Sequence, residues 1–267
     1  MTLEASSAGL LQSSMMSDMG VKTIDIDGMP RGGPHASWLD RRLQTDCQEY
    51  LDRDDVDDDL KAQVVRSLDW VGNVFKEHER NTRLVLDEVA DVADPAILEL
   101  GAGHGALSRL ILDQHPTATV TVTDLNPASV TTIAAGDLGH HPRATVEVMD
   151  ATAIGRPDGS YDLAVFALSF HHLPPPQAVQ VFAEGTRVAA KLLIIDLPRP
   201  PSLMHLVQLA TMAPLAAVIP LVHDGLISSL RAYSRSALRA LARCADPAIQ
   251  VQFRNHGLGR QVIVASR

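Results

Sequence analysis

Three glycines on alternate positions follow a short apolar run and open a predicted helix. Residues 97–108 read Ile-Leu-Glu-Leu-Gly-Ala-Gly-His-Gly-Ala-Leu-Ser. Because glycine has no Cβ, Gly101, Gly103 and Gly105 allow positive φ angles and a close approach between backbone and ligand. Glu99 adds a carboxylate two positions before the first glycine. The pattern indicates a nucleotide-cofactor turn, although it also fits a loose dinucleotide motif and the glycines could serve the turn alone.

Polar side chains follow four further apolar runs that are typical of strands. They are Asp124 after residues 119–123, Asp150 after residues 145–149, His171 and His172 after residues 161–169, and Asp196 after residues 191–195. Ligands of an open parallel sheet bind outside the carboxyl ends of its strands. The sequence therefore predicts that these groups converge with the glycine turn on one rim.

The acids at this rim have both ligand-binding and structural interpretations. An ionised Asp124 can accept hydrogen bonds from both hydroxyls of a ribose, and it would repel a 2′-phosphate. Alternatively it caps the following helix, since Asn126-Pro127 also reads as a helix start. Asp150 could be a turn aspartate, and Glu99 could pair with a lysine or arginine elsewhere.

With the segment 150–161, Asp-Ala-Thr-Ala-Ile-Gly-Arg-Pro-Asp-Gly-Ser-Tyr, these residues resemble one enzyme family. It is the class I S-adenosylmethionine-dependent methyltransferases of the small-molecule type, which includes ubiquinone and menaquinone biosynthesis C-methyltransferases and related O-methyltransferases. The resemblance covers about residues 95–200. It departs at residues 187–191, Arg-Val-Ala-Ala-Lys, where the family often has Pro-Gly-Gly.

The resemblance implies an α/β fold: a Rossmann-like, seven-stranded, mostly parallel sheet with an antiparallel C-terminal strand. It implies S-adenosyl-L-methionine as cofactor, with the glycine turn at the methionine part, Glu99 near the amino group, Asp124 at the ribose and Asp150 at the adenine. The implied cofactor-binding residues are Glu99, Gly101, Ala102, Gly103, Gly105, Asp124, Leu125, Asp150, Ala151 and Leu168.

His171 and His172 are the candidates for handling a proton of the acceptor, because an unperturbed histidine titrates near neutral pH. In some O-methylating relatives a histidine after strand four acts with an acid after strand five, a place that Asp196 takes here. Neighbours in an extended segment point in opposite directions, so at most one histidine is expected to reach the acceptor. The other interpretation is that one packs and one caps the next helix. No histidine pair has ligand spacing with a third ligand nearby, so no metal is expected.

The chain divides into a tail at residues 1–30, expected to be disordered, a helical extension at 31–93, and the methyltransferase domain at 94–267. Helical spacing from residue 59 and a second helix over residues 77–91 define the extension. The resemblance makes His78, Glu79 and Arg80 candidate walls of the acceptor pocket, although an exposed polar patch between two helices is favoured.

Residues 200–223 contain no Asp, Glu, Lys or Arg. This length would be sufficient for a membrane-spanning helix, but Pro214 and Pro220 argue against a continuous lipid-facing helix. Two short helices forming an apolar lid are expected, with core packing or interfacial membrane contact as alternatives. A turn at Asp224-Gly225 follows, then a helix capped by Ser234 or Ser236, and strands at residues 248–254 and 261–265. Arg231 and Tyr233 could face the pocket.

Composition narrows the function classes. A formal net charge of −9 argues against a nucleic-acid partner. Residues 31–60 carry nine acids and four arginines, which reads as a solvated face. Two cysteines without a spacing motif and no secretory signal favour the reducing cytoplasm. We expect methyl transfer to a small, partly apolar acceptor, with O-methylation slightly favoured. An NAD-dependent oxidoreductase and a catalytically silent cofactor-binding protein are the alternatives, and a homodimer stays open.

Overall fold

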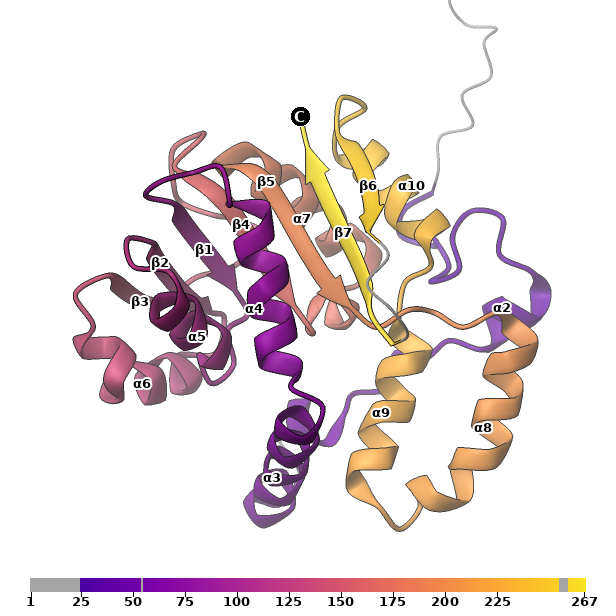
Figure 1. Cartoon of the computed structure of the whole chain (residues 1–267). Helices are drawn as coiled ribbons and strands as arrows, with labels where there is room; N and C mark the ends of the chain where they lie inside the picture. Colours follow the sequence, from indigo (N-terminus) through magenta and orange to yellow (C-terminus); the bar gives the residue numbers. More distant parts are fainter. Residues whose placement is uncertain (1–24, 54, 255–258) are drawn as a thin grey trace, which may run out of the picture.

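A computed structural model describes residues 25–53, 55–254 and 259–267 and centres on one seven-stranded sheet (Figure 1). Its order is β3-β2-β1-β4-β5-β7-β6. The strands are β1 (Ala96–Leu100), β2 (Thr119–Asp124), β3 (Ala144–Val148), β4 (Tyr161–Ala167), β5 (Ala189–Asp196), β6 (Gln250–Arg254) and β7 (Gln261–Ser266). The first five strands pair in parallel, while β7 runs antiparallel to both β5 and β6. The expected fold class is confirmed.

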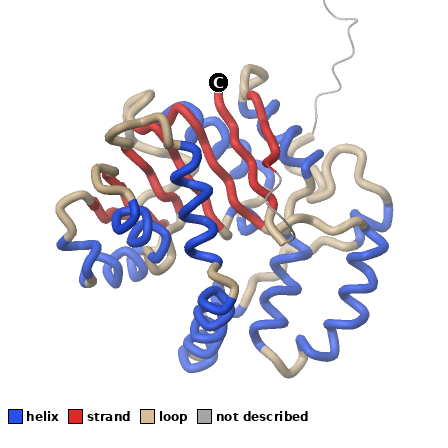
Figure 2. Tube along the Cα trace, viewed as in Figure 1, coloured by secondary structure: helices blue, strands red, loops and turns tan. Residues whose placement is uncertain are grey.

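Helices cover both faces of this sheet, as Figure 2 shows. On one face α7 (Pro175–Val188) and α10 (Arg235–Ala245) bury Phe182 and Leu241 against the strands. On the other face α4 (Glu77–Glu88), α5 (Ala106–Gln114) and α6 (Pro127–Ala135) bury residues such as Val85 and Ile111. Because both faces are covered, the central strands β4 and β5 are apolar almost throughout.

The N-terminal part contributes α2 (Trp38–Arg42), the 3-10 turn η1 (Tyr50–Asp52) and α3 (Asp58–Val74) before α4. Helix α3 lies beyond the end of the sheet at which β1 and β5 end, and it contacts α4 and α9 (Figure 1). The two expected helices are therefore present, with α4 ending at Glu88 instead of residue 91. Of the expected disordered tail, residues 1–24 lie outside the described residues.

Two helices follow β5, but they differ from the expected lid. They are α8 (Ser202–Ala216) and α9 (Pro220–Arg231), and α9 runs straight through the turn predicted at Asp224-Gly225. Asp224 is buried and accepts a hydrogen bond from the Tyr50 amide at 2.9 Å, which explains why an acid is tolerated there. Helix α8 leaves Leu203 71% and Met204 62% exposed.

No helix in the described part of the chain is long and apolar enough to cross a membrane. The remaining predictions for this region agree with the structure. Ser234 caps α10, accepting a hydrogen bond from the Ala237 amide, and β6 and β7 form the antiparallel hairpin.

Candidate active site

The glycine turn joins β1 to α5 and takes left-handed backbone angles at all three glycines. The φ values are +66° at Gly101, +57° at Gly103 and +73° at Gly105. A Cβ would lie 2.8 Å from Ser169 Oγ at the first and 2.6 Å from Leu138 Cδ1 at the third, so crowding also requires glycine there. At Gly103 a Cβ would meet no described atom within 4 Å. The middle glycine therefore borders open space where a cofactor could lie.

Asp124 links the end of β2 to this turn. Its carboxylate accepts hydrogen bonds from the backbone amides of Gly103 at 2.9 Å and Asn126 at 2.8 Å. The alternative that Asp124 caps the next helix is wrong, because Asn126 is the N-cap and accepts from the Ala128 amide. Asp124 is thus fixed beside the turn and remains partly exposed to a ligand.

Glu99 is buried at the end of β1 and its carboxylate contacts the Ser108 hydroxyl of α5. Burial raises the pKa of Glu99 to about 7, and the charge of Asp124 acts in the same direction. Within the described part of the chain, no lysine or arginine pairs with Glu99, contrary to the alternative interpretation. A cation beside this buried carboxyl would favour its charged form and so lower its pKa.

The other expected cofactor residues lie along the same rim. Asp150, after β3, is exposed and accepts hydrogen bonds from the Thr152 amide at 2.8 Å and hydroxyl at 2.7 Å, as a turn aspartate does. Ala102 donates its amide to Thr123, joining the ends of β1 and β2. Leu125 is exposed and Ala151 partly buried. Leu168 has φ +61°, and its amide donates to Ile195 at 2.7 Å.

A cavity of about 430 Å³ opens beside this rim and has a mixed lining. Its apolar side chains are Leu51, Val65, Leu68, Leu168, Leu197 and Leu221. His104 of the glycine turn also lines it, so it adjoins the cofactor rim. His78 is a wall residue, whereas Glu79 and Arg80 are not, and the favoured exposed patch is correct for Arg80.

Helix α9 contributes several residues to this cavity, and α8 contributes none of its lining. The expected lid of two helices is therefore wrong for α8. Its one buried residue, His205, lies 3.1 Å from the Ser229 hydroxyl of α9. Helix α8 thus supports α9 from outside.

His171 is buried, and its Nδ1 lies 2.7 Å from Asp196 Oδ1, which brings together the predicted histidine and acid. Burial lowers the pKa of His171, but the charges of Asp196 and Glu49 outweigh it and raise the pKa to about 9. The ring is therefore protonated on both nitrogens at neutral pH. In this state it donates hydrogen bonds and does not accept a proton.

His172 lies against its neighbour instead of pointing away. Residues Phe170–His172 form the 3-10 turn η3, and the two imidazole centroids are 4.3 Å apart. The expectation that at most one histidine reaches the acceptor assumed an extended segment, but these residues form a 3-10 turn and both histidines line the cavity. His172 Nδ1 lies 2.8 Å from Asp52 Oδ2.

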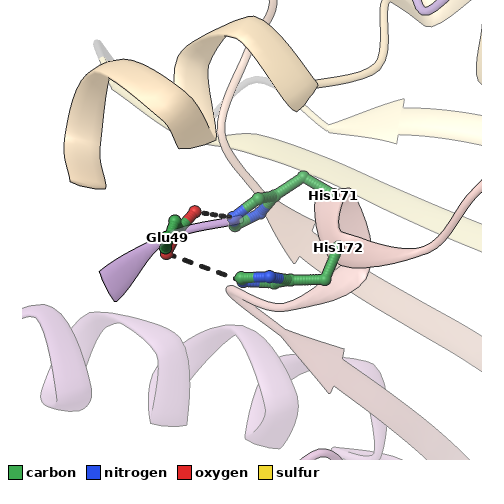
Figure 3. Close-up of side chains that lie close together, drawn as sticks. All are labelled: Glu49, His171 and His172. Atoms are coloured by element: carbon green, nitrogen blue, oxygen red, sulfur yellow. Dashed lines mark ion pairs between the residues drawn. The ribbon is translucent and has the colours of Figure 1, made fainter. Parts of the chain in front are cut away.

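Glu49 is a site residue that the sequence interpretation missed. It is buried, accepts a hydrogen bond from Ser228 at 2.6 Å, and lies 3.4 Å from His171 Nε2 and 4.0 Å from His172 Nε2 (Figure 3). Asp40 is also buried and pairs with Arg199 at 2.9 Å. The acidic run is therefore not simply a solvated face. Tyr50 and Leu51, apolar neighbours of Glu49, are the one weak signal in the sequence.

Histidine spacing in the sequence indicated no third ligand near a histidine pair, but folding brings one there. Glu49 supplies a third potential ligand from more than a hundred residues away, and one ligand atom from each of Glu49, His171 and His172 lies within 4.8 Å of the others.

Arg231 and Tyr233 hold η3 from behind instead of facing the cavity. Arg231 donates to the His172 carbonyl at 2.7 Å, and the Tyr233 hydroxyl donates to the Leu173 carbonyl at 2.8 Å. Arg31 donates to the carbonyls of His171 and Leu173, both at 2.9 Å. These buried donors fix the backbone that carries both histidines.

Comparisons with known proteins point to one family. A family model described as "Methyltransferase domain" matches residues 97–191. Malonyl-[acyl-carrier protein] O-methyltransferase of Geobacter sulfurreducens is 36% identical over 102 residues, which cover 38% of this chain and 37% of the relative. The match thus spans little more than a third of that protein's length.

Solved structures show the fold over a longer stretch. The plantazolicin methyltransferase BpumL, solved with a pentazolic desmethylPZN analog and SAH, is 12% identical with a TM-score of 0.62 and covers 85% of this chain and 96% of its own. The [4+2]-cyclase SpnF is 16% identical with a TM-score of 0.52, covering 70% of this chain and 80% of its own. The solved structures show the fold alone, while the family-model match, which spans the glycine turn and the acids Asp124 and Asp150, shows that residues 97–191 are a methyltransferase domain of the class I S-adenosylmethionine-dependent type.

Proposed function

We propose that this protein transfers a methyl group from S-adenosyl-L-methionine to an oxygen of a small, partly apolar acceptor held in the 430 Å³ cavity. The observation that carries the proposal is that this cavity adjoins the glycine turn through His104 and the end of β4 through Leu168. An acceptor in the cavity would thus lie next to a cofactor on the rim. Alignment of the two reactants is the main requirement of an in-line displacement.

The residues of the rim fit the cofactor. Open space above Gly103 leaves room for it, Asp124 keeps a partly exposed carboxylate for the ribose hydroxyls, and an ammonium group at Glu99 would stabilise the charged form of that buried carboxyl. When bound, the cofactor supplies an electrophilic sulfonium methyl group: the acceptor oxygen donates a lone pair to the methyl carbon, and the carbon–sulfur electron pair remains on sulfur.

The cavity favours a neutral hydroxyl over a carboxylate as the acceptor. Its acids Glu49, Asp52, Glu77 and Asp224 outnumber its cations Arg260 and His171, and Arg260 is paired with Glu77. The excess of negative charge would disfavour an anion, while the leucines bury apolar surface. The acceptor oxygen would lie by the His171 and His172 rings, with Asp196 orienting His171. The hydroxyl proton would pass to His172, which lines the cavity beside Asp52, and from there to solvent. The name of the Geobacter relative supports an oxygen acceptor.

The alternatives receive different support. Nothing in the comparisons favours an NAD-dependent oxidoreductase. The likeness to a [4+2]-cyclase shows that this fold is not restricted to methyl transfer, so cofactor binding alone does not establish the reaction. For location we propose the reducing cytoplasm, which the two free, exposed thiols of Cys47 and Cys244 support.

The proposal is tested with a labelled methyl donor and fractionated small-molecule extracts. We expect label to appear in a hydroxyl-bearing product, identified by mass spectrometry as an added methyl group on oxygen. Asp124→Ala should abolish labelling together with cofactor binding. Label on a carboxylate would refute the acceptor class, and cofactor binding without label transfer to any fraction would favour the silent alternative.

A further inference from the structure

We propose that Glu49, His171 and His172 form a binding site for a divalent transition-metal ion, with Zn²⁺ as the best-matched ion. The three residues come from the N-terminal extension and from η3, and their side chains meet at the cavity wall (Figure 3). Metal binding here does not depend on methyl transfer. Its contribution to catalysis rests on the proposed function.

The two rings are held as metal-binding histidines are held. In such sites the second ring nitrogen usually contacts a carboxylate or carbonyl, which fixes the tautomer and the ring orientation. Here Asp196 lies 2.7 Å from His171 Nδ1, and Asp52 lies 2.8 Å from His172 Nδ1. Both carboxylates engage Nδ1, so each Nε2 can coordinate a shared metal ion once the ion displaces the proton that this nitrogen carries.

One of these atoms is buried and makes no hydrogen bond of good geometry with the described residues. Among the described residues, His171 Nε2 has no hydrogen-bond partner, although the ring is 3% exposed and Glu49 Oε1 lies 3.4 Å away. Buried polar atoms are normally satisfied, and an exception calls for a missing ion or water. Asp224, which lines the same cavity, has a similarly unpartnered Oδ2.

The spacing suits a small cation with short bonds. Zinc–nitrogen and zinc–oxygen bonds near 2 Å in a tetrahedron place neighbouring ligand atoms about 3.3 Å apart. Glu49 Oε1 lies 3.4 Å from His171 Nε2, and Glu49 Oε2 lies 4.0 Å from His172 Nε2. A modest side-chain adjustment would therefore complete the site, leaving a fourth position open toward the cavity.

Charge and donor type favour such an ion. Glu49, Asp196 and Asp224 are all buried near the histidines, and a divalent cation would offset part of this negative charge. Two imidazoles with one carboxylate match Zn²⁺ and its transition-metal neighbours, whereas Mg²⁺ and Ca²⁺ prefer oxygen ligands. An acceptor hydroxyl at the open position would become more acidic, which would assist loss of its proton.

The experiment uses the full chain after dialysis against a chelator, titrated with Zn²⁺ in competition with a chromogenic chelator. We expect one equivalent to bind tightly. Glu49→Gln and His172→Gln should each weaken binding by more than the roughly 10- to 100-fold that loss of an outer carboxylate costs, and Asp52→Asn should fall within that range. His78→Gln, which changes another histidine of the cavity, should bind as the unaltered protein does.

Two further measurements keep the result interpretable. The titration is repeated on Cys47→Ser/Cys244→Ser, because both exposed thiols could hold zinc on their own. S-adenosylhomocysteine binding is measured on every variant, which separates loss of the metal site from misfolding and from failure of the proposed function. Absence of tight binding, or equal affinity in the unaltered protein and Glu49→Gln, would overturn the metal site.

Discussion

The cofactor rim and the acceptor cavity are built in different ways. The rim, formed by residues 99–105, 124–126 and 150–151, consists of strand ends and backbone amides that lie within the region matched by the family model. The cavity draws Glu49 and Asp52 from before that region and Leu197 and Asp224 from after it. We therefore propose that the region matched by the family model supplies the cofactor site, and that segments outside it contribute to the acceptor site.

The two regions also differ in what fixes them. At the rim, left-handed glycines and backbone hydrogen bonds set the geometry, so local sequence is sufficient. In the cavity, buried carboxylates and imidazoles hold one another across distant segments. Substitutions at the rim should therefore affect cofactor binding, and substitutions in the cavity should affect transfer.

The largest effect is expected at the rim. Asp124→Ala removes the carboxylate that we propose accepts two ribose hydrogen bonds, each worth about 1.5 to 3 kcal/mol. S-adenosylhomocysteine should bind about 10²- to 10⁴-fold more weakly in calorimetry. Asp137→Ala, which removes an exposed partner of Arg109, is the matched control and should bind normally. Equal affinity in both variants would remove Asp124 from the cofactor site.

Substitutions in the cavity should lower the rate of methyl transfer and leave cofactor affinity nearly unchanged. His172→Gln removes a ring that lines the cavity, and we expect the transfer rate to fall about 10²-fold or more, within the range of proton-transfer catalysis. S-adenosylhomocysteine affinity should stay within a factor of about two, since this ring is outside the rim. A loss of cofactor affinity as large as the loss of rate would show that the two regions are not separable.

Glu99 should make stability depend on pH. Its pKa is about 7 in the folded protein against an ordinary 4.5, so as pH rises from 4.5 the unfolded chain loses this proton first. Stability should fall between pH 4.5 and 7 by about 3 kcal/mol relative to Glu99→Gln, and then level off. Denaturant unfolding of both proteins across this range measures the difference, and parallel curves would contradict the assignment.

The smallest effect separates two glycines of one turn. Gly103→Ala and Gly105→Ala both place a Cβ at positive φ, which costs about 1 to 2 kcal/mol. Gly105→Ala also crowds Leu138, so it should be about 1 kcal/mol less stable than Gly103→Ala in denaturant unfolding. Gly103→Ala should mainly weaken cofactor binding. The reverse order of stabilities would mean that the open space lies elsewhere.

The sheet and the rim could be predicted because their signals are local. Apolar or β-branched runs predicted β1 to β5, and Asp124, Asp150 and Asp196 marked the carboxyl ends of β2, β3 and β5. The cavity could not be predicted, because Glu49 and its histidines are joined by folding and not by spacing. The turn predicted at Asp224-Gly225 was wrong for a related reason. Asp-Gly is a local turn signal, yet a hydrogen bond from the distant Tyr50 amide stabilises Asp224 within α9.

The most direct test of the account is a crystal structure with S-adenosylhomocysteine bound. We expect the ribose hydroxyls of the ligand to bind the Asp124 carboxylate and its amino group to lie near Glu99. Its sulfur should face the cavity that His171 and His172 line. A ligand bound away from Gly103, or with its sulfur directed away from that cavity, would contradict it.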